Sequence, residues 1–412
     1  MSPSQPHPGL SGRAFVAIVA SLMAVGALGT DIMLPAMPAI ARGLHVTVEN
    51  QQQWIVASYM AGHGSTQLLF GPLSDRYGRK PVLLAGLVAF VLTSLLVAAS
   101  TTFTMLLIAR AAQGMSSATT RVLVSSIVRD NYAGRKMARV MSLAFMIFLG
   151  VPILAPSIGQ AIMAVFSAWQ MIFILLAAYG AIVTVVVWLK LPETLDPDNR
   201  RAISPSVIFS AFSIVLRDRY SLGYTLASTG LFGALLGFIN SSQQIFAEAL
   251  HAPDRFTLVF AIASAGMGLG AFANSRIVER LGSRLVSHSA LLAFIAVTAT
   301  HLAYAMIWRE TVLSFAIFQT LTMTCFALSA SNFSAMAMER MGHVAGSAAS
   351  VQGFISTMLG GAVIGLLIGQ QFNGTVVPVV AGFVVVGVAA LLIVLWTEQG
   401  RLFQARNAII TV

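Results

Sequence analysis

The sequence predicts an all-α membrane protein in which twelve transmembrane helices form two pseudo-symmetric six-helix bundles. Two observations carry this prediction: the composition is too apolar for a water-soluble fold, and the apolar residues fall into twelve runs divided by one long polar interruption. Of the 412 residues, 57% are hydrophobic and only 9% are charged, whereas soluble domains carry about 25% charged residues. Lipid is therefore expected to be the solvent for most of the surface.

The twelve apolar runs have about the length of 20 residues that a helix needs to cross a bilayer. The polar stretch between the sixth and seventh runs divides the chain. We expect an N-terminal six-helix bundle at 1–189, a cytoplasmic linker at 190–221 and a C-terminal six-helix bundle at 222–412. Within the linker, Ile208 to Leu216 fits either a short interfacial helix or a plain connection. The runs lie near residues 14–38, 51–70, 82–99, 103–125, 138–163, 168–189, 222–246, 256–275, 286–307, 311–332, 344–371 and 375–397.

Basic residues indicate how the chain lies in the membrane. The net charge is +10, but the basic residues sit in short gaps between apolar runs, which argues against nucleic-acid binding. Only Arg42, Arg255 and Arg309 fall in loops on the side away from the termini. Cytoplasmic loops are enriched in Lys and Arg, so both termini are expected to be cytoplasmic. Residues 1–13 lack the features of a cleaved signal peptide.

The sequence also argues against several kinds of chemistry. The single cysteine, Cys325, has no partner for an intrachain disulfide, and no Cys/His cluster suggests a metal or another cofactor. No G-x-x-x-x-G-K-[ST] loop is present to bind ATP. We expect a monomer that is not an enzyme, with a small-molecule substrate, protons and the lipid bilayer as its partners.

Two loops echo each other at corresponding places in the two halves. The loop after the second run reads GPLSDRYGRKP and the loop after the eighth reads SRIVERLGSRL. Asp75-Arg76-x-Gly78 aligns with Glu279-Arg280-x-Gly282. Parallel repeats of six spans are typical of one transporter architecture.

The first of these loops resembles the signature loop of the major facilitator superfamily, G-x-x-x-D-R/K-x-G-R-R/K. The resemblance implies that the loop latches the two halves together on the cytoplasmic side. Asp75 would hold that latch, with Arg135 or the start of the eleventh span as its partner. The alternative is a solvated charge run. The residues assigned to the latch are Gly71, Asp75, Arg76, Gly78, Arg79 and Arg135.

Three further segments resemble motifs of the twelve-span drug/proton antiporters within that superfamily. Thr30 to Pro35 resembles the first-span motif, and Arg110 to Gly114 resembles the fourth-span motif R-x-x-Q-G. Val151 to Gln160 resembles the fifth-span antiporter motif G-P-x-x-G-G through Pro152, Pro156 and Gly159, although Ala155 and Gln160 replace glycines. The resemblance implies a bacterial inner-membrane exporter like those for bicyclomycin and chloramphenicol or florfenicol.

Asp31 and Arg110 are the charged residues expected to carry proton coupling. Ionisable residues within a span are costly and mark functional positions. Asp31 lies late in the first span and Arg110 early in the fourth, so both fall at a similar depth, and we expect them to meet in the central cavity. A buried carboxylate beside an arginine is suited to proton exchange. The alternative is a permanent structural ion pair.

Candidate substrate contacts are polar, aromatic or methionine side chains within spans. His63 could share a proton relay or be a hydrogen-bonded interior histidine. Asn240 and Gln244 lie on one helix face and could contact substrate or join helices. Arg121 could attract anions, although extension to the inner surface or a carbonyl partner is favoured over that role. The expected contacts are Met23, Tyr59, His63, Met146, Asn240, Gln244 and Phe354.

Together these features predict proton-coupled efflux of small drug-like molecules by alternating access. Some antiporters of this type carry a second acid two turns before the first-span aspartate. Here Met23 or its neighbours occupy that place, and a single carboxylate suits neutral or zwitterionic substrates. The rival functions are proton-coupled transport of a natural metabolite and a membrane sensor that transports nothing.

Overall fold

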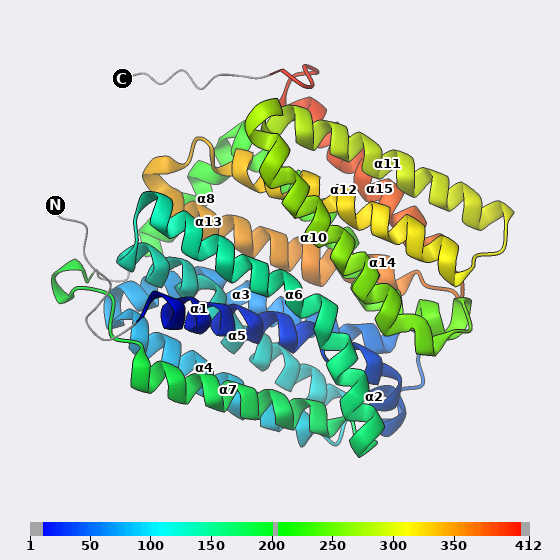
Figure 1. The fold of residues 1–412 in the computed structure, drawn as a ribbon, viewed down its shortest axis with the longest axis horizontal. Coiled ribbons are helices and arrows are strands. Elements are labelled where there is room, and N and C mark those ends of the chain that lie inside the picture. Colours follow the sequence, from blue (N-terminus) through cyan, green and yellow to red (C-terminus); the bar gives the residue numbers. More distant parts are fainter. Residues whose placement is uncertain (1–10, 201–204, 405–412) are drawn as a thin grey trace.

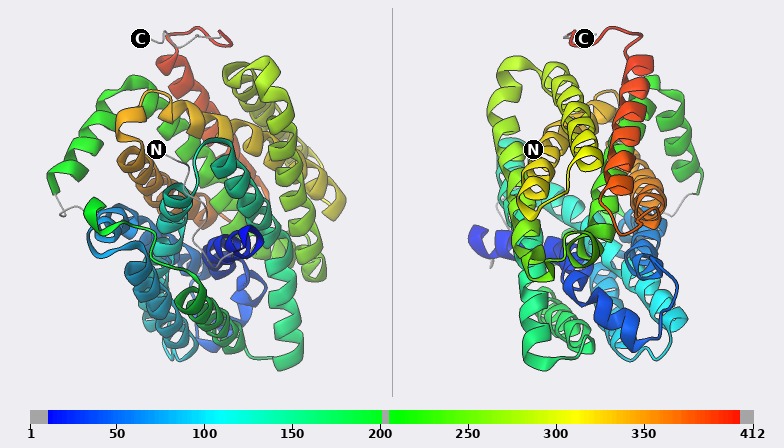
Figure 2. Two further views of the ribbon diagram at one scale, coloured as in Figure 1. Left: turned by 60° about the vertical axis from the view of Figure 1, so that its left-hand side comes forward. Right: turned by 90° about the vertical axis from the view of Figure 1, so that its right-hand side faces the viewer.

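A computed structural model describes residues 11–200 and 205–404 and confirms the predicted fold. Within these ranges the regular structure is entirely helical. The helices form two bundles that lie side by side, one from the first half of the chain and one from the second (Figure 1). Figure 2 shows the same pair of bundles from two further directions.

The first bundle contains six long helices and one short one. The first span is interrupted after Asp31 by a 3-10 turn at Leu34–Ala36, where Pro35 cannot donate a backbone hydrogen bond. Side-chain caps from Ser11 and Thr102 begin the first and fourth spans. The helices are α1 (Gly12–Asp31), α2 (Met37–Gly43), α3 (Trp54–Tyr77), α4 (Arg79–Ala98), α5 (Phe103–Asn131), α6 (Gly134–Phe166) and α7 (Gln170–Lys190).

The second bundle repeats this arrangement, and π-helical turns interrupt two of its spans. One π turn, Ile245–Ala249, follows α9; the other, Ser356–Ile364, joins α13 to α14 within the eleventh span. π-helical turns are rare in proteins overall, and those that occur are often found at functional sites. The helices are α9 (Arg219–Gln244), α10 (Phe256–Leu281), α11 (Ser283–Ile307), α12 (Val312–Met338), α13 (Ala345–Ile355), α14 (Gly365–Gln370) and α15 (Val377–Thr397).

The linker between the bundles contains a further helix, α8 (Pro205–Arg217). It packs against α13, where the rings of Phe212 and Phe354 meet edge to face with centroids 5.8 Å apart. Of the two arrangements that the sequence allowed at Ile208 to Leu216, the structure has a helix and not a plain connection, and this helix begins about one turn earlier.

Nine helical segments of the described ranges are long and apolar enough to cross a membrane. The other long helices are α3, α5 and α6. The first two carry many polar side chains, and many of these are buried between helices; on α5 the buried ones include Arg110, Gln113 and Ser117. The low apolar content of α3 and α5 therefore reflects their position in the interior of the bundle.

The two bundles touch along two lines. Helix α3 packs against the eleventh span, and α6 packs against α10. We call the side where α1 begins and α15 ends the terminal face, and the other side the opposite face. At the terminal face the segment Gly71 to Pro81, predicted as a loop, forms the end of α3 and the start of α4, with Gly78 alone between the two helices. Asn50 precedes α3 at the opposite face.

Candidate functional site

The crossing of α3 and α5 gives the N-terminal bundle its tightest contact. A methyl group at Gly62 would overlap the carbonyl oxygen of Ala111, and one at Gly114 would overlap that of Tyr59. Glycine at both positions lets the two backbones approach closely. This contact presses the α3 side chains Tyr59 and His63 against the polar face of α5.

Arg110 is fully buried at this crossing, and three acceptors hold its guanidinium group. Its Nη1 donates to the carbonyl of Gly29 at 2.9 Å and to Gln113 Oε1 at 2.6 Å, and its Nε donates to the carbonyl of Ile55 at 3.3 Å. The guanidinium also lies 4.4 Å from the centre of the Tyr59 ring, a cation–π contact. Nη2 has no partner among the described residues.

Asp31 ends α1 in the same region, only 4% exposed and close to Tyr59. Within the described part of the chain its carboxylate forms no ion pair and no hydrogen bond. The ion pair with Arg110 that the sequence led us to expect is thus not formed in this structure. The reason is that backbone carbonyls and Gln113 already hold the arginine, and Tyr59 is the neighbour that both charged residues share.

His63 belongs to a hydrogen-bonded group that also contains Tyr59 and Ser117. Its Nδ1 lies 2.9 Å from Ser117 Oγ, which also accepts a 2.8 Å hydrogen bond from the Tyr59 hydroxyl. The rings of Tyr59 and His63 stack with their centroids 6.1 Å apart. Both side chains are buried, so either would meet a substrate only after the bundles part.

Amide side chains join the two bundles at the opposite face. We call the group Asn50, Gln53, Gln244 and Gln370 the amide lock. Gln53 Nε2 donates to Gln244 Oε1 at 2.7 Å and to the carbonyl of Gly369 at 3.0 Å. Gln244 Nε2 donates to Asn50 Oδ1 at 2.9 Å, and Gln370 Nε2 donates to the carbonyl of Asn50 at 2.8 Å. The structure therefore places Gln244 in a contact between the bundles.

Asn240, one turn before Gln244, is buried and has no hydrogen-bond partner for either amide atom in the part of the chain described. The same is true of Gln319 on the neighbouring helix α12, and of the hydroxyl of Ser241. Buried polar atoms are normally paired with protein or water. These three side chains are available to bind water or a polar ligand.

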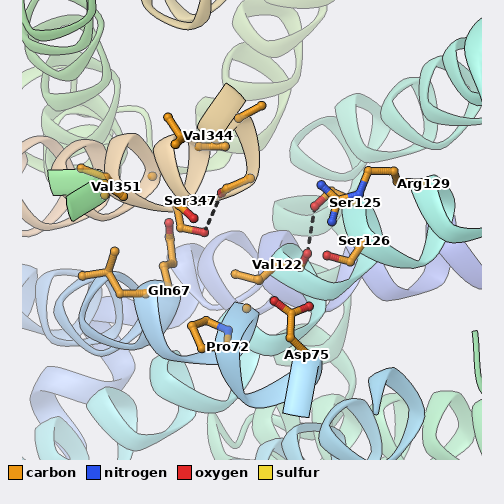
Figure 3. A pocket seen from close by; sticks show the side chains of 18 of the residues that line it. Gln67, Pro72, Asp75, Val122, Ser125, Ser126, Arg129, Val344, Ser347 and Val351 are labelled. Atoms are coloured by element: carbon orange, nitrogen blue, oxygen red, sulfur yellow. Dashed lines mark hydrogen bonds between the residues drawn. The ribbon is translucent and has the colours of Figure 1, made fainter. Parts of the chain in front are cut away.

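A cavity of about 1120 Å³ lies between the bundles at the terminal face. Asp75 and Ser125 line one wall, and Val344 and Ser347 at the start of α13 line the other (Figure 3). At its inner end Gln67 Nε2 donates to Thr357 Oγ1 across the bundles at 3.0 Å. Asp31 and Arg110 are not among the residues that line this cavity.

The signature loop is held by contacts to the N-terminal bundle and to Glu193 at the start of the linker. Gly78 has φ of +102°, a conformation that favours glycine, and it ends α3. The Arg79 side chain pairs with Asp75 and, at 3.1 Å, with Asp130 at the end of α5. The backbone N–H groups of Arg79 and Lys80 donate to Glu193. Asp75 thus faces the cavity, and it forms its ion pair with Arg79 of its own loop.

The C-terminal bundle repeats this charge network. Gly282 has φ of +81° at the place equivalent to Gly78. Nearby, Arg284 pairs with Glu339 after the fourth helix of its bundle at 3.2 Å and with Glu398 after the sixth at 2.7 Å. Asp130 and Glu193 occupy the matching places in the first bundle. The weak echo seen in the sequence is therefore a repeat of structure.

The structure gives several other predicted residues ordinary packing roles. Met23 packs against the N-terminal core, and Arg76 lies over the Tyr77 ring at 5.3 Å. Phe354 meets Phe212 of α8, so it does not extend into the space around Asp31. Gly71 lines the terminal-face cavity. The side chains of Arg135 and Met146 lie outside the described residues.

The antiporter-like segment of α6 makes contacts to both bundles. Pro152 and Pro156 lie inside the helix. Gly159 touches the backbone of the first span so closely that a methyl group there would overlap the carbonyl oxygen of Ile32. Gln160, which replaces a motif glycine, accepts a 2.6 Å hydrogen bond from Thr257 of α10. This substitution therefore adds a bond between the bundles.

Comparison with known proteins identifies the family. A sequence model described as Major Facilitator Superfamily matches residues 19–365. The chain belongs to the Major Facilitator Superfamily. As a member, it is a multi-pass membrane transporter rather than an enzyme, and the family predicted from the signature loop is confirmed.

Relatives of the chain include several named transporters. It is 30% identical to the uncharacterized MFS-type transporter YdgK of Bacillus subtilis, over 89% of this chain and 91% of that protein. It is 28% identical to the bicyclomycin resistance protein homolog of Haemophilus influenzae, over 88% and 91%. Among solved structures, the human organic anion transporter MFSD10 has the same fold, with a TM-score of 0.68 at 18% identity, covering 93% of this chain and 99% of that one.

Sequence reasoning missed several residues that the structure brings to these sites. Gln53 and Gln319 are the main ones, and both are buried. Gln53 ends the polar run Asn50 to Gln53, whereas Gln319 lies within an apolar run. An amide within an apolar run is itself a signal, because it needs a partner when lipid is the solvent. Asp130 and Glu193, in contrast, sit at helix ends among other charges, where the sequence does not single them out.

Proposed function

We propose that this transporter is a proton-coupled exporter of small neutral or zwitterionic drug-like molecules that works by alternating access. The observation that carries the proposal is Asp31, a buried carboxylate without an ion-pair partner in the described structure, next to Tyr59 and Arg110. A charge at this depth is costly. Proton uptake removes that charge and proton release restores it, so the proton can bias how the surrounding helices pack.

The arrangement of contacts between the bundles supports alternating access. The amide lock closes the opposite face, and the cavity opens a path at the terminal face. In the other state the lock would part and the cavity would close, bringing Asp75 towards the start of α13. The latch at that face would be formed by Asp75, Arg79 and Gly78. In the interior, Arg110 would respond to the charge on Asp31 through Tyr59.

Relatives of the chain point to drugs as the substrate class. The Haemophilus influenzae relative is named a bicyclomycin resistance protein homolog, and multidrug resistance protein D of Escherichia coli is 34% identical over 44% of this chain and 45% of that protein. We propose that the chain resides as a monomer in a bacterial inner membrane with both termini cytoplasmic. Tyr59, His63, Asn240 and Gln319 are the proposed substrate contacts.

The test compares the wild type with Asp31→Asn in a drug-sensitive bacterium that lacks its main pumps. The wild type is expected to confer resistance to at least one neutral or zwitterionic drug in a panel, and Asp31→Asn, which is nearly isosteric, is expected to abolish it at equal protein abundance. Asp254→Asn, an exposed acid at the opposite face, serves as the matched control. Full resistance with Asp31→Asn would rule out the coupling role, and no resistance from the wild type would favour the metabolite transporter.

A further inference from the structure

One wall of the terminal-face cavity carries a row of hydrogen-bond donors on α5. Arg121, Ser125 and Arg129 all line the cavity and lie at i, i+4 and i+8 on that helix. With a rise of about 1.5 Å per residue, the two arginine Cα atoms are about 12 Å apart along the axis. Ser125, visible beside Arg129 in Figure 3, lies between them. The spacing allows both guanidinium groups to reach one bound molecule.

The charges in the cavity do not balance locally. All 14 Asp and Glu residues lie in the described ranges, and the acids that line the cavity are Asp75 and Asp130. Both pair with Arg79. Arg121 and Arg129 form an ion pair with none of the acidic side chains. The cavity thus presents two guanidinium groups without a protein counter-charge.

Arg121 lines the cavity two helical turns deeper than Arg129. Within the described residues its side chain forms no hydrogen bond to a carbonyl, which was one of the two arrangements that the sequence favoured. Arg129 reaches towards the other bundle, where its Nη1 lies 3.4 Å from the place of a Cβ atom on Gly346. Arg79, Arg121 and Arg129 outnumber Asp75 and Asp130 among the charged residues that line the cavity. A cleft with net positive charge and low-dielectric walls attracts anions.

We propose that Arg121 and Arg129 form an anion-binding subsite that takes the carboxylate, sulfonate or phosphate group of a bound molecule. A guanidinium group pairs with such oxyanions through two parallel hydrogen bonds. This proposal rests on the proposed function in one respect, because it assumes that the bound anion is a transported substrate. It extends the substrate class from neutral and zwitterionic molecules to organic anions, with the acidic group held near the terminal face.

The test measures binding to the purified full chain in nanodiscs of phosphatidylcholine without a proton gradient. The probes are 2-naphthoate and its neutral analogue 2-naphthamide, followed by equilibrium dialysis. Arg121→Gln and Arg129→Gln are each expected to weaken naphthoate binding about tenfold and to leave naphthamide binding unchanged. Arg276→Gln, an exposed arginine of α10 outside the cavity, is the matched control. Equal naphthoate affinity in the wild type and both cavity variants would overturn the proposal.

A second arm distinguishes free anions from lipid headgroups as the occupant. Nanodiscs containing phosphatidylglycerol are expected to weaken naphthoate binding to the wild type if a headgroup competes for the two arginines, and to change nothing if free anions are the ligands. The subsite stands in either case, because loss of binding in the arginine variants is what defines it. Failure of the chain to export drugs would count against the proposed function and leave this binding result unaffected.

Discussion

Removing Gln53 should release the opposite face. In the amide lock its Nε2 makes two short hydrogen bonds across the bundles, at 2.7 Å to Gln244 and 3.0 Å to the carbonyl of Gly369, and its Oε1 accepts a longer one of 3.4 Å from Gln370. The side chain is fully buried. At about 1 kcal/mol net for each of the two short bonds, Gln53→Ala should destabilise the closed state by about 2 kcal/mol. This corresponds to about a 30-fold shift towards the state open at the opposite face.

The assay is the distance between spin labels placed on either side of the lock, measured by double electron–electron resonance. Cysteines at the exposed positions Val48 and Gln371 carry the labels in a Cys325→Ser background. Gln53→Ala should add or enlarge a longer-distance population. Gln52→Ala, the neighbouring glutamine without a side-chain hydrogen bond in the described structure, should leave the distribution as in the wild type. Identical distributions in all three proteins would refute the reasoning.

Two further predictions concern close packing and the buried arginine. Gly159→Val should lower the melting temperature of the purified protein, because overpacking against the Ile32 carbonyl costs about 1–3 kcal/mol; Gly150→Val, where the structure has open space, should not, and equal effects would contradict the contact. Arg110→Lys should also lower the melting temperature, by a loss of about 2–4 kcal/mol, because an ammonium cannot reproduce the fork of three hydrogen bonds. An unchanged thermal unfolding curve would show that those bonds contribute nothing net.

Much of the fold could be predicted because lipid imposes a simple rule on sequence. The apolar run at 82–99 located α4, and the run at 286–307 located α11, since a spanning helix must be both long and apolar. The helix ends that the sequence predicted at the terminal face were less accurate. Helix α5 continues to Asn131 through Arg129 and Asp130, because polar side chains in water extend a helix without extending its hydrophobic run.

The candidate site was less predictable because it depends on which helix faces meet. The sequence identified Asp31 and Arg110 as costly charges at similar depth, and the structure does bring both to Tyr59. The sequence could not reveal that Arg110 would donate to the carbonyl of Gly29 instead of to the Asp31 carboxylate. Backbone acceptors are present at every residue, so no residue pattern marks the ones that a buried arginine will use.

The amide lock has a consequence for how the transporter would respond to its surroundings. Amide groups do not titrate in the physiological range, and neutral hydrogen bonds are not weakened by ionic screening as surface ion pairs are. The contacts among Asn50, Gln53, Gln244 and Gln370 can therefore sense neither protons nor salt. Any dependence of opposite-face opening on pH must then originate in titratable groups outside the lock, and a pH series on the labelled protein would report on those groups.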